Sequence, residues 1–239
     1  MLDLEEFHKR TSKVFNLEKF KDKTVAVVGC GGVGSFSAEF LARAGITNLV
    51  LIDFDKADLS NLARQNYVLD DLNESKVIAL KKRILKINPQ VKITVFNQAL
   101  DQDNAKALLN KVDILLSAVD SFKTKKEINQ ICKELGIPFF HASAFKQNAE
   151  LLFVTKDSAC LECVYPNINE SPEKPEEVGV TPAVPTIVGL MAANMILNYL
   201  ANKISYENIL FRFDFKTMDF HKIKIKKRKD CRVCNALNS

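Results

Sequence analysis

The stretch VAVVGCGGVGS, residues 25–35, joins a run of valines to four glycines within six residues. The valine-rich part is typical of a strand that is buried on both faces. The glycines are Gly29, Gly31, Gly32 and Gly34, and they fit the pattern G-x-G-x-x-G between a strand and a helix. Glycines there let a phosphate approach the backbone, and the helix N-terminus supplies N–H donors. The stretch therefore predicts a nucleotide-binding turn, without separating ATP from NAD.

Strands and helices alternate along the chain around this turn. We expect strands at 24–29, 48–55, 92–100, 112–120, 138–145 and 149–155, and helices at 35–45, 74–88, 103–111 and 124–136. This alternation predicts an α/β fold, a doubly wound, Rossmann-like, mainly parallel sheet with helices on both faces. A helix at 186–201 and strands within 208–225 are expected to complete the same layer. Residues 3–20 predict one amphipathic helix.

We expect one domain over residues 1–239. Its predicted parts are an N-terminal helix (1–20), a nucleotide-binding part (24–145), and a last part (146–239) with a crossover loop, a metal site and C-terminal strands. Residues 166–185 hold five of the seven prolines and predict a long loop.

The net charge is +5 with a pI near 8.8, which weakly favours acidic partners or nucleotides. The basic run at 222–232 alternates apolar and charged residues, which indicates a solvated edge strand rather than a nucleic-acid surface. The N-terminus lacks the apolar core of a signal peptide. The apolar stretch 185–201 contains two asparagines and predicts a buried helix rather than a membrane span. We therefore expect a cytoplasmic protein.

An acidic residue follows the second predicted strand, 24 residues after Gly29. This residue is Asp53, at the position where a carboxylate accepts a hydrogen bond from a ribose hydroxyl. Asp55, Asn61 and Arg64 follow shortly after it, and Lys76 lies in the next predicted helix. Fixed amide and cationic donors of this kind suit a triphosphate.

Asp120 ends the fourth predicted strand, at the carboxyl edge of the sheet where ligands bind in such folds. A carboxylate there could hold Mg²⁺ against the phosphates.

Two C-x-x-C pairs lie in the second half of the chain and are separated by 67 residues. They are Cys160 with Cys163, and Cys231 with Cys234. Four thiolates form the donor set of a structural, tetrahedral zinc site, in which no position stays open for substrate. Such a site would anchor the C-terminal tail at the base of the proline-rich loop; two separate redox pairs are the alternative.

These features together resemble the MoeB/ThiF/HesA family, the bacterial and archaeal relatives of ubiquitin-activating enzymes. The matching stretches are GCGGVG at 29–34, LIDFDKADLSNLARQ at 51–65, ESKV at 74–77, INP at 87–89, AVD at 118–120, and both C-x-x-C pairs in family order. The stretch GVTPAVPTIVGLMAANMILNYL, residues 179–200, is also similar to the eukaryotic enzyme that activates the ubiquitin-like modifier UFM.

The resemblance implies ATP-Mg-dependent adenylation of a small ubiquitin-like or sulfur-carrier protein at its C-terminal Gly-Gly, with release of pyrophosphate. It implies that Asp53 binds the ribose and that Asp120 holds magnesium. The remaining implied ligands are Asn61, Arg64 and Lys76, which would bind the phosphates beside Asp55.

The resemblance also implies a homodimer in which Arg10 reaches the ATP bound to the partner subunit. The implied catalytic residues are thus Arg10, Arg64, Lys76 and Asp120. A carboxylate nucleophile is already ionised at neutral pH, so no general base is needed. Thr181 stands where relatives that form a thioester carry a cysteine, which predicts adenylation without a thioester and transfer to an acceptor such as a sulfur donor.

Two alternatives stay open from the sequence. Relatives of this family adenylate a tRNA base modification, although no sequence feature here demands RNA. The glycine turn alone would also suit an NAD-dependent oxidoreductase, in which Arg64, Lys76 and the four paired cysteines would have no function.

Overall fold

The computed structural model describes residues 2–166, 179–202 and 204–235. Its strands form one eight-stranded sheet in the order β3-β2-β1-β4-β5-β6-β7-β8. The strands are β1 (Thr24–Val28), β2 (Asn48–Ile52), β3 (Lys92–Phe96), β4 (Ile114–Ser117), β5 (Phe139–Phe145), β6 (Asn148–Val154), β7 (Ile209–Asp214) and β8 (Asp219–Lys224). β3, β2, β1, β4 and β5 are parallel, whereas β6, β7 and β8 are antiparallel. The predicted mainly parallel Rossmann-like sheet is confirmed.

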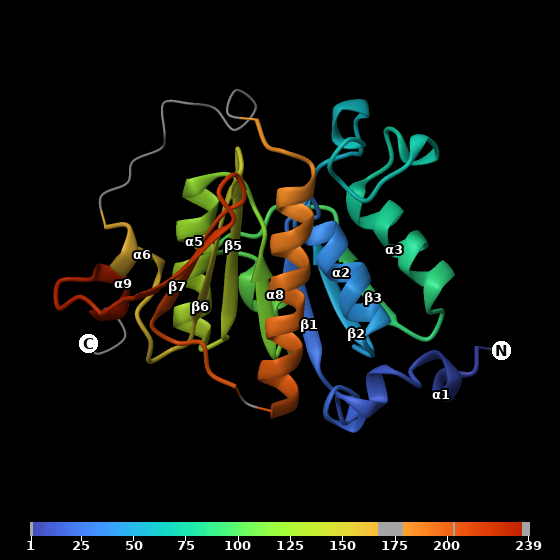
Figure 1. Ribbon diagram of the computed structural model, residues 1–239, viewed down its shortest axis with the longest axis horizontal. Helices are drawn as coiled ribbons and strands as arrows, with labels where there is room; N and C mark the ends of the chain where they lie inside the picture. The colour runs from blue at the N-terminus through green and yellow to red at the C-terminus, as the bar shows by residue number, and fades with distance from the viewer. Residues whose placement is uncertain (1, 167–178, 203, 236–239) are drawn as a thin grey trace.

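Helices cover both faces of this sheet, as predicted (Figure 1). One face carries α2 (Gly34–Arg43), α3 (Lys76–Ile87) and α8 (Ala183–Asn202), and the other carries α5 (Phe122–Leu135) with the short α4 (Ala105–Leu108). Short helices α6 (Leu161–Val164) and α9 (Arg232–Asn235) carry the two cysteine pairs. Alternate residues of each strand therefore belong to two separate hydrophobic cores.

Helix α8 packs closely against α2 through small residues. A Cβ atom at Gly189 would lie 2.5 Å from the carbonyl oxygen of Val33, so any larger residue there would push the helices apart. The Ser37 hydroxyl donates to the Gly189 carbonyl oxygen at 2.9 Å. α8 is long and apolar enough to cross a membrane by composition, but 56% of its apolar window is buried within the protein, as in a core helix.

The prediction of one amphipathic helix over 3–20 is wrong. The segment forms α1 (Leu4–Phe7) and two single turns, Thr11–Lys13 and Leu17–Lys19. Thr11, Ser12 and Asn16 interrupt the pattern, because their side chains compete for backbone hydrogen bonds; Asn16 accepts from Glu18 N–H and caps the last turn. The exposed apolar face expected of a single long helix therefore does not exist.

The N-terminal segment lies at the amino edge of the parallel strands. A Cβ atom at Gly45, just after α2, would lie 3.2 Å from Leu17 and 3.7 Å from His8. Lys19 donates to the carbonyl oxygen of Ala201 near the end of α8. The segment is thus separated from the glycine turn by the length of α2, about 15 Å for ten residues.

The expected loop at 166–185 falls mostly outside the described residues. Where the chain is described again, Lys146 and Val180 form a parallel bridge, and Thr181 N–H donates to the Lys146 carbonyl oxygen at 2.9 Å. Pro185 then lies against the glycine turn, 3.0 Å from where a Cβ atom of Gly32 would be. Residues 179–185 therefore cross from the β5–β6 turn to the glycine turn.

Candidate functional site

The glycine turn at 29–34 packs its backbone directly on the end of β4. Gly29 has φ +88°, and a Cβ atom there would lie 2.6 Å from the carbonyl oxygen of Ala118. A Cβ atom at Gly34 would lie 1.9 Å from the Gly29 carbonyl oxygen. At Gly31 the nearest neighbour would be the Gln65 side chain at 3.8 Å, so packing does not explain this glycine. Gly31 marks the open side of the turn, where a phosphate could approach.

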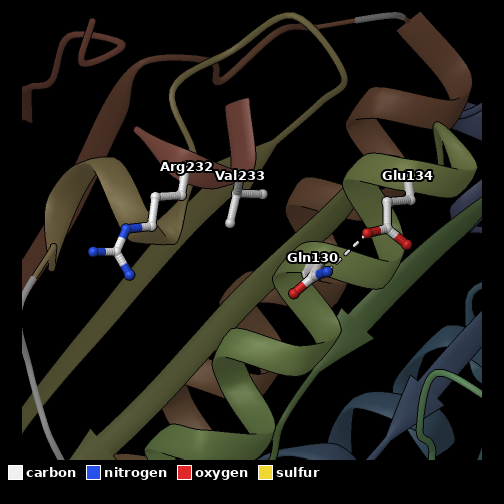
Figure 2. A pocket seen from close by; sticks show the side chains of 4 residues that line it. All are labelled: Gln130, Glu134, Arg232 and Val233. Carbon is white, nitrogen blue, oxygen red and sulfur yellow. Dashed lines mark hydrogen bonds between the residues drawn. The ribbon is translucent and has the colours of Figure 1, made fainter. Parts of the chain in front are cut away.

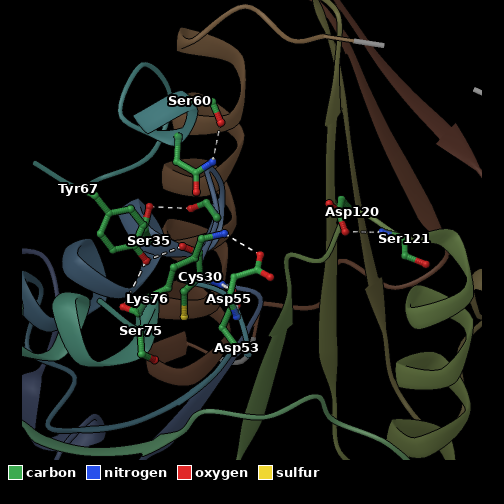
Figure 3. Close-up of polar contacts among 12 residues, drawn as sticks. Cys30, Ser35, Asp53, Asp55, Ser60, Tyr67, Ser75, Lys76, Asp120 and Ser121 are labelled. Carbon is green, nitrogen blue, oxygen red and sulfur yellow. Dashed lines mark hydrogen bonds and ion pairs between the residues drawn. The ribbon is translucent and has the colours of Figure 1, made fainter. Parts of the chain in front are cut away.

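Asp53 fastens this turn to the end of β2 (Figure 3). One carboxylate oxygen accepts from Cys30 N–H at 2.6 Å, and the other accepts from Asp55 N–H at 2.8 Å. Burial raises the pKa of Asp53, while these hydrogen bonds and the charge of Lys76 oppose the rise. The carboxylate is thus fixed beside the turn, and the predicted ribose contact remains a prediction.

Lys76 is the first residue of α3 and lies against the glycine turn. Its ammonium is 2.7 Å from the Asp55 carboxylate, and its own N–H donates to the Asp55 carbonyl oxygen at 2.9 Å. The lysine side chain is 7% exposed and the Asp55 side chain 49%, so the open side of the pair is the carboxylate. A phosphate could replace Asp55 as the partner of the lysine.

Asn61 and Arg64 belong to the loop between β2 and α3. The Arg64 guanidinium donates to the Ser60 carbonyl oxygen at 2.8 Å, and the Asn61 amide donates to the Ser60 hydroxyl at 3.3 Å. Both residues are at least partly exposed. Their side chains are held by this loop itself, and their predicted phosphate contacts remain predictions.

Asp120 is exposed at the end of β4 and accepts from Ser121 N–H at 2.7 Å. Figure 3 shows it across the carboxyl edge from the Lys76–Asp55 pair, with the strand ends between them. The structure thus brings Gly29, Asp53, Asp55 and Lys76 together and places Asp120 on the opposite side of the same edge. Arg10 is exposed in the N-terminal segment and does not join them within its own chain.

Tyr67, which the sequence did not indicate as a site residue, supports the glycine turn through a hydrogen bond. Its hydroxyl donates to the Cys30 carbonyl oxygen at 2.7 Å and lies 3.4 Å from the Lys76 carbonyl oxygen. Burial raises the pKa of Tyr67, so the phenol stays protonated and can donate. A lone tyrosine in a loop gives no spacing signal that could have revealed it.

The four paired cysteines meet in space, all buried, with their sulfur atoms within 4.8 Å of one another. The S···S separations are 3.9 Å for Cys160–Cys163, 3.6 Å for Cys160–Cys231 and 3.7 Å for Cys163–Cys234. Zinc–sulfur bonds of about 2.3 Å in tetrahedral geometry require sulfurs about 3.8 Å apart. The sulfur positions therefore fit a zinc ion, and the four residues could hold a metal.

Backbone donors surround this cluster. Arg228 N–H points at the Cys163 sulfur at 3.4 Å, and Cys234 N–H points at the Cys231 sulfur at 3.5 Å. A hydrogen bond from the Cys160 thiol, together with the Arg228 N–H, lowers the pKa of Cys163. The remaining free cysteines, Cys30 and Cys132, are buried elsewhere in the cores.

Two shallow grooves lie near these sites. One, of about 470 Å³, is lined by Leu62, Val68, Leu69 and Asp70 beside the phosphate-binding candidates, and we call it the apolar groove. The other, of about 120 Å³, lies between α5 and α9 and is lined by Gln130, Glu134, Arg232 and Val233 (Figure 2). The second is smaller than a nucleotide site requires.

The chain resembles curated enzymes over most of its length. It is 29% identical over 225 residues to the sulfur carrier protein ThiS adenylyltransferase of Escherichia coli (strain K12), covering 93% of this chain and 90% of that protein. It is 33% identical over 251 residues to ubiquitin-like modifier-activating enzyme 5 of Drosophila persimilis, covering 95% of this chain and 65% of that enzyme. The Xenopus laevis enzyme 5 is 34% identical, and the match covers 88% of this chain and 58% of that enzyme. The chain thus spans less than two thirds of the length of these two ubiquitin-like modifier-activating enzymes.

Solved structures share the fold. Escherichia coli MccB with MccA-N7isoASN superposes with a TM-score of 0.84 at 20% identity, covering 98% of this chain and 75% of that one. MccB with ATP gives a TM-score of 0.81 at 22% identity, covering 93% and 70%. The family model of the ThiF family matches residues 3–233, which is consistent with adenylyltransferase activity. The chain belongs to the ThiF family.

Proposed function

We propose that residues 1–239 form one adenylation domain that adenylates the C-terminal glycine carboxylate of a ubiquitin-like or sulfur-carrier protein with ATP-Mg. The observation that carries the proposal is the buried Lys76 held beside the glycine turn by the more exposed Asp55. The NAD-dependent alternative assigns no function to this cation, whereas a triphosphate needs fixed cationic donors. The named activities of the two curated relatives point in the same direction.

The proposed binding places the triphosphate along the glycine turn. Lys76, Arg64 and Asn61 bind the phosphates, and Asp53 binds the ribose. The exposed Asp120 carboxylate keeps one oxygen free of Ser121 N–H, which suits Mg²⁺, a cation that prefers oxygen ligands. When bound, magnesium would neutralise charge on the phosphates.

The reaction then needs no proton transfer. An oxygen of the substrate carboxylate forms a bond to the α-phosphorus as the bond to the pyrophosphate oxygen breaks, and pyrophosphate leaves with the electron pair. The groups of this chain act by holding two anions together and by stabilising the negative charge that builds on the leaving group. Charge neutralisation of this kind explains a site built from lysine, arginine and aspartate.

A zinc ion in the cysteine cluster would have a structural function, because all four sulfur donors come from the protein. It would fasten the C-terminal tail to the segment that precedes residues 167–178.

We propose that the protein works as a cytoplasmic homodimer in which Arg10 completes the partner subunit's site. The apolar groove supports this: Val68 is 49% exposed and Leu69 68%, and the groove adjoins the phosphate-binding candidates. This surface adds to the family resemblance, which by itself implies a homodimer.

Thr181 supports adenylation without a thioester. It is exposed, at the start of the segment that crosses to the glycine turn, whereas Cys30 and Cys132 are 0% and 1% exposed. With no accessible thiol there, the acyl-adenylate would pass to a sulfur donor or another acceptor. Incubation with ATP and carrier should give an adenylate and no conjugate that a thiol reagent releases.

The deciding experiment is ATP–pyrophosphate exchange with carriers that end in Gly-Gly, such as ThiS, compared with the same carriers lacking the last glycine. Exchange that depends on the intact carrier supports the proposal. Exchange only with modified tRNA would support the tRNA-modifying alternative. Thermal stabilisation by NAD and not by ATP-Mg would contradict both.

A further inference from the structure

Buried charges in the described part of the chain are almost all paired. Lys76 faces Asp55 at 2.7 Å, and Asp53 accepts from two N–H groups. Glu150 contacts Arg212 at 2.6 Å and the Tyr165 hydroxyl at 2.5 Å. The remaining two buried charges, Lys125 and Lys133, both lie on α5.

All hydrogen-bond donors of the Lys133 ammonium have an acceptor, and the residue has a structural function. Its ammonium donates to the carbonyl oxygens of Thr155, Lys156 and Ser158 at 3.0, 2.6 and 3.0 Å. Three acceptors use all three protons of the ammonium group.

Lys125 is different, although it is only 8% exposed. Among the described residues it donates one hydrogen bond, to the neutral hydroxyl of Ser143 at 3.1 Å. Two of its three protons thus have no acceptor in the part of the chain that the structure describes. Burial lowers the pKa of Lys125, while the charges of Asp120 and Glu150 oppose the change. A buried cation in this state is costly unless an anion joins it.

Among residues 2–166, 179–202 and 204–235, no anion lies at contact distance from Lys125. Glu150 lies opposite Ser143 in the strand register, but Arg212 and Tyr165 already occupy its two oxygens. Asp120 is exposed and turned to Ser121 N–H. His141, on the same strand as Ser143, is buried with an unpartnered Nδ1, and burial together with the charge of Lys125 lowers its pKa to about 3.

The position of Lys125 separates it from the phosphate-binding candidates. Lys76 and Arg64 lie on the β2 side of the glycine turn, whereas α5 starts immediately after Asp120 and Ser143 lies on β5. Asp120 is therefore between the two sets of cations. The β5–β6 turn, to which Thr181 is bonded, lies at the same end of β5 as Ser143.

We propose that the Lys125 ammonium, supported by Ser143, binds the carboxylate of the substrate on the side of Asp120 opposite Lys76. The inference rests on the proposed function, and it assigns the two anions of the reaction to two separate cations. Phosphates bind at Lys76 and the incoming carboxylate binds at Lys125, and Asp120, which would hold magnesium, lies between them. Lys125 is then a substrate-binding residue that offsets the repulsion between carboxylate and triphosphate.

The test compares Lys125→Gln, Lys125→Arg and a control, Lys123→Met, which removes an exposed lysine from the same helix. Two quantities are measured for each: the affinity for ATP-Mg without carrier, by calorimetry, and carrier-dependent pyrophosphate exchange, with ThiS among the carriers. Lys125→Gln should lower kcat/KM for the carrier by about 100-fold, as the loss of a buried charged contact does. Its ATP-Mg affinity should stay within about 3-fold of wild type, and Lys125→Arg should recover part of the exchange.

Four results would overturn the inference. A parallel loss of ATP-Mg affinity would assign Lys125 to the phosphates, and unchanged exchange would leave it without function. A Lys125→Gln protein that does not fold would show a structural function that the described contacts do not contain. If the wild-type protein binds ATP-Mg but shows no exchange with any carrier, the proposed function itself fails, and the inference fails with it.

Discussion

The two ends of α5 differ in how completely their polar groups are paired. At its C-terminal end, Lys133 has three carbonyl acceptors, and Gly136 closes the helix in the left-handed conformation with φ +69°. Nearby, the cysteine cluster has sulfur positions ready for a metal. At the N-terminal end, Asp120 is exposed and Lys125 is buried with one neutral partner.

The difference separates a structural region from a binding region on one helix. Most polar groups that only support the fold have partners within the chain, because an unsatisfied buried group lowers stability. A site that must receive charged ligands keeps some groups without a partner. The same rule applies to the Lys76–Asp55 pair. Its more exposed member, the Asp55 carboxylate, lies at the carboxyl edge of the sheet, where ligands bind in such folds.

Loss of metal from the cysteine cluster should have the largest effect. Cys163→Ser should abolish binding of one zinc per chain and expose the C-terminal tail to proteolysis, because structural zinc contributes on the order of 10 kcal/mol to small sites. Metal analysis and limited proteolysis measure both effects. Cys132→Ala, a change of a buried cysteine on α5 outside the cluster, should keep the zinc; zinc retained in Cys163→Ser would refute the four-sulfur site.

Lys133→Met should lower the free energy of unfolding by about 3–5 kcal/mol, because three buried carbonyl groups lose their donor. For a domain of this size the midpoint of thermal unfolding should fall by about 10 °C. Urea denaturation followed by circular dichroism would measure the change. A loss below about 1 kcal/mol would show that water replaces the ammonium. It would contradict a structural function for the C-terminal end of α5.

His141 should make stability depend on pH. Its pKa in the folded protein, about 3, is below the ordinary value of 6.5. Between these two pH values the unfolded chain therefore binds a proton at His141 that the folded protein does not bind. The free energy of unfolding is therefore highest above the ordinary pKa and falls as the pH falls below it. The slope approaches about 1.4 kcal/mol per pH unit for one proton. His141→Leu should reduce the slope of unfolding free energy between pH 6 and 4 by about that amount. An unchanged slope would show that the imidazole is hydrated in the folded state.

Lys125→Met should have the smallest effect on stability, within about 1 kcal/mol of wild type, because one neutral hydrogen bond is lost and a poorly paired buried charge is removed. Denaturation under the conditions used for Lys133→Met gives a direct comparison of two buried lysines on one helix. Equal losses for the two variants would contradict the division of α5 into a structural and a binding end.

The sequence predicted the parallel half of the sheet well, because the valine runs and the intervening amphipathic helices carry strong periodic signals. The cysteine cluster was also predicted, since two C-x-x-C pairs restrict the chemistry even at a separation of 67 residues. The N-terminal segment was not, because apolar residues at helical spacing also fit separate turns capped by residues such as Asn16. Tyr67 and Lys125 were missed because their importance comes from burial and from the partners that they have or lack, which no local pattern records.

The cysteine cluster connects parts of the chain that are far apart in the sequence. An ion held by Cys160 and Cys234 would close a loop that contains α8, β7 and β8. A force applied to the chain beyond Cys234 would meet this closure before any strand of the sheet. The resistance of the sheet to unfolding from that side would then depend on bound metal.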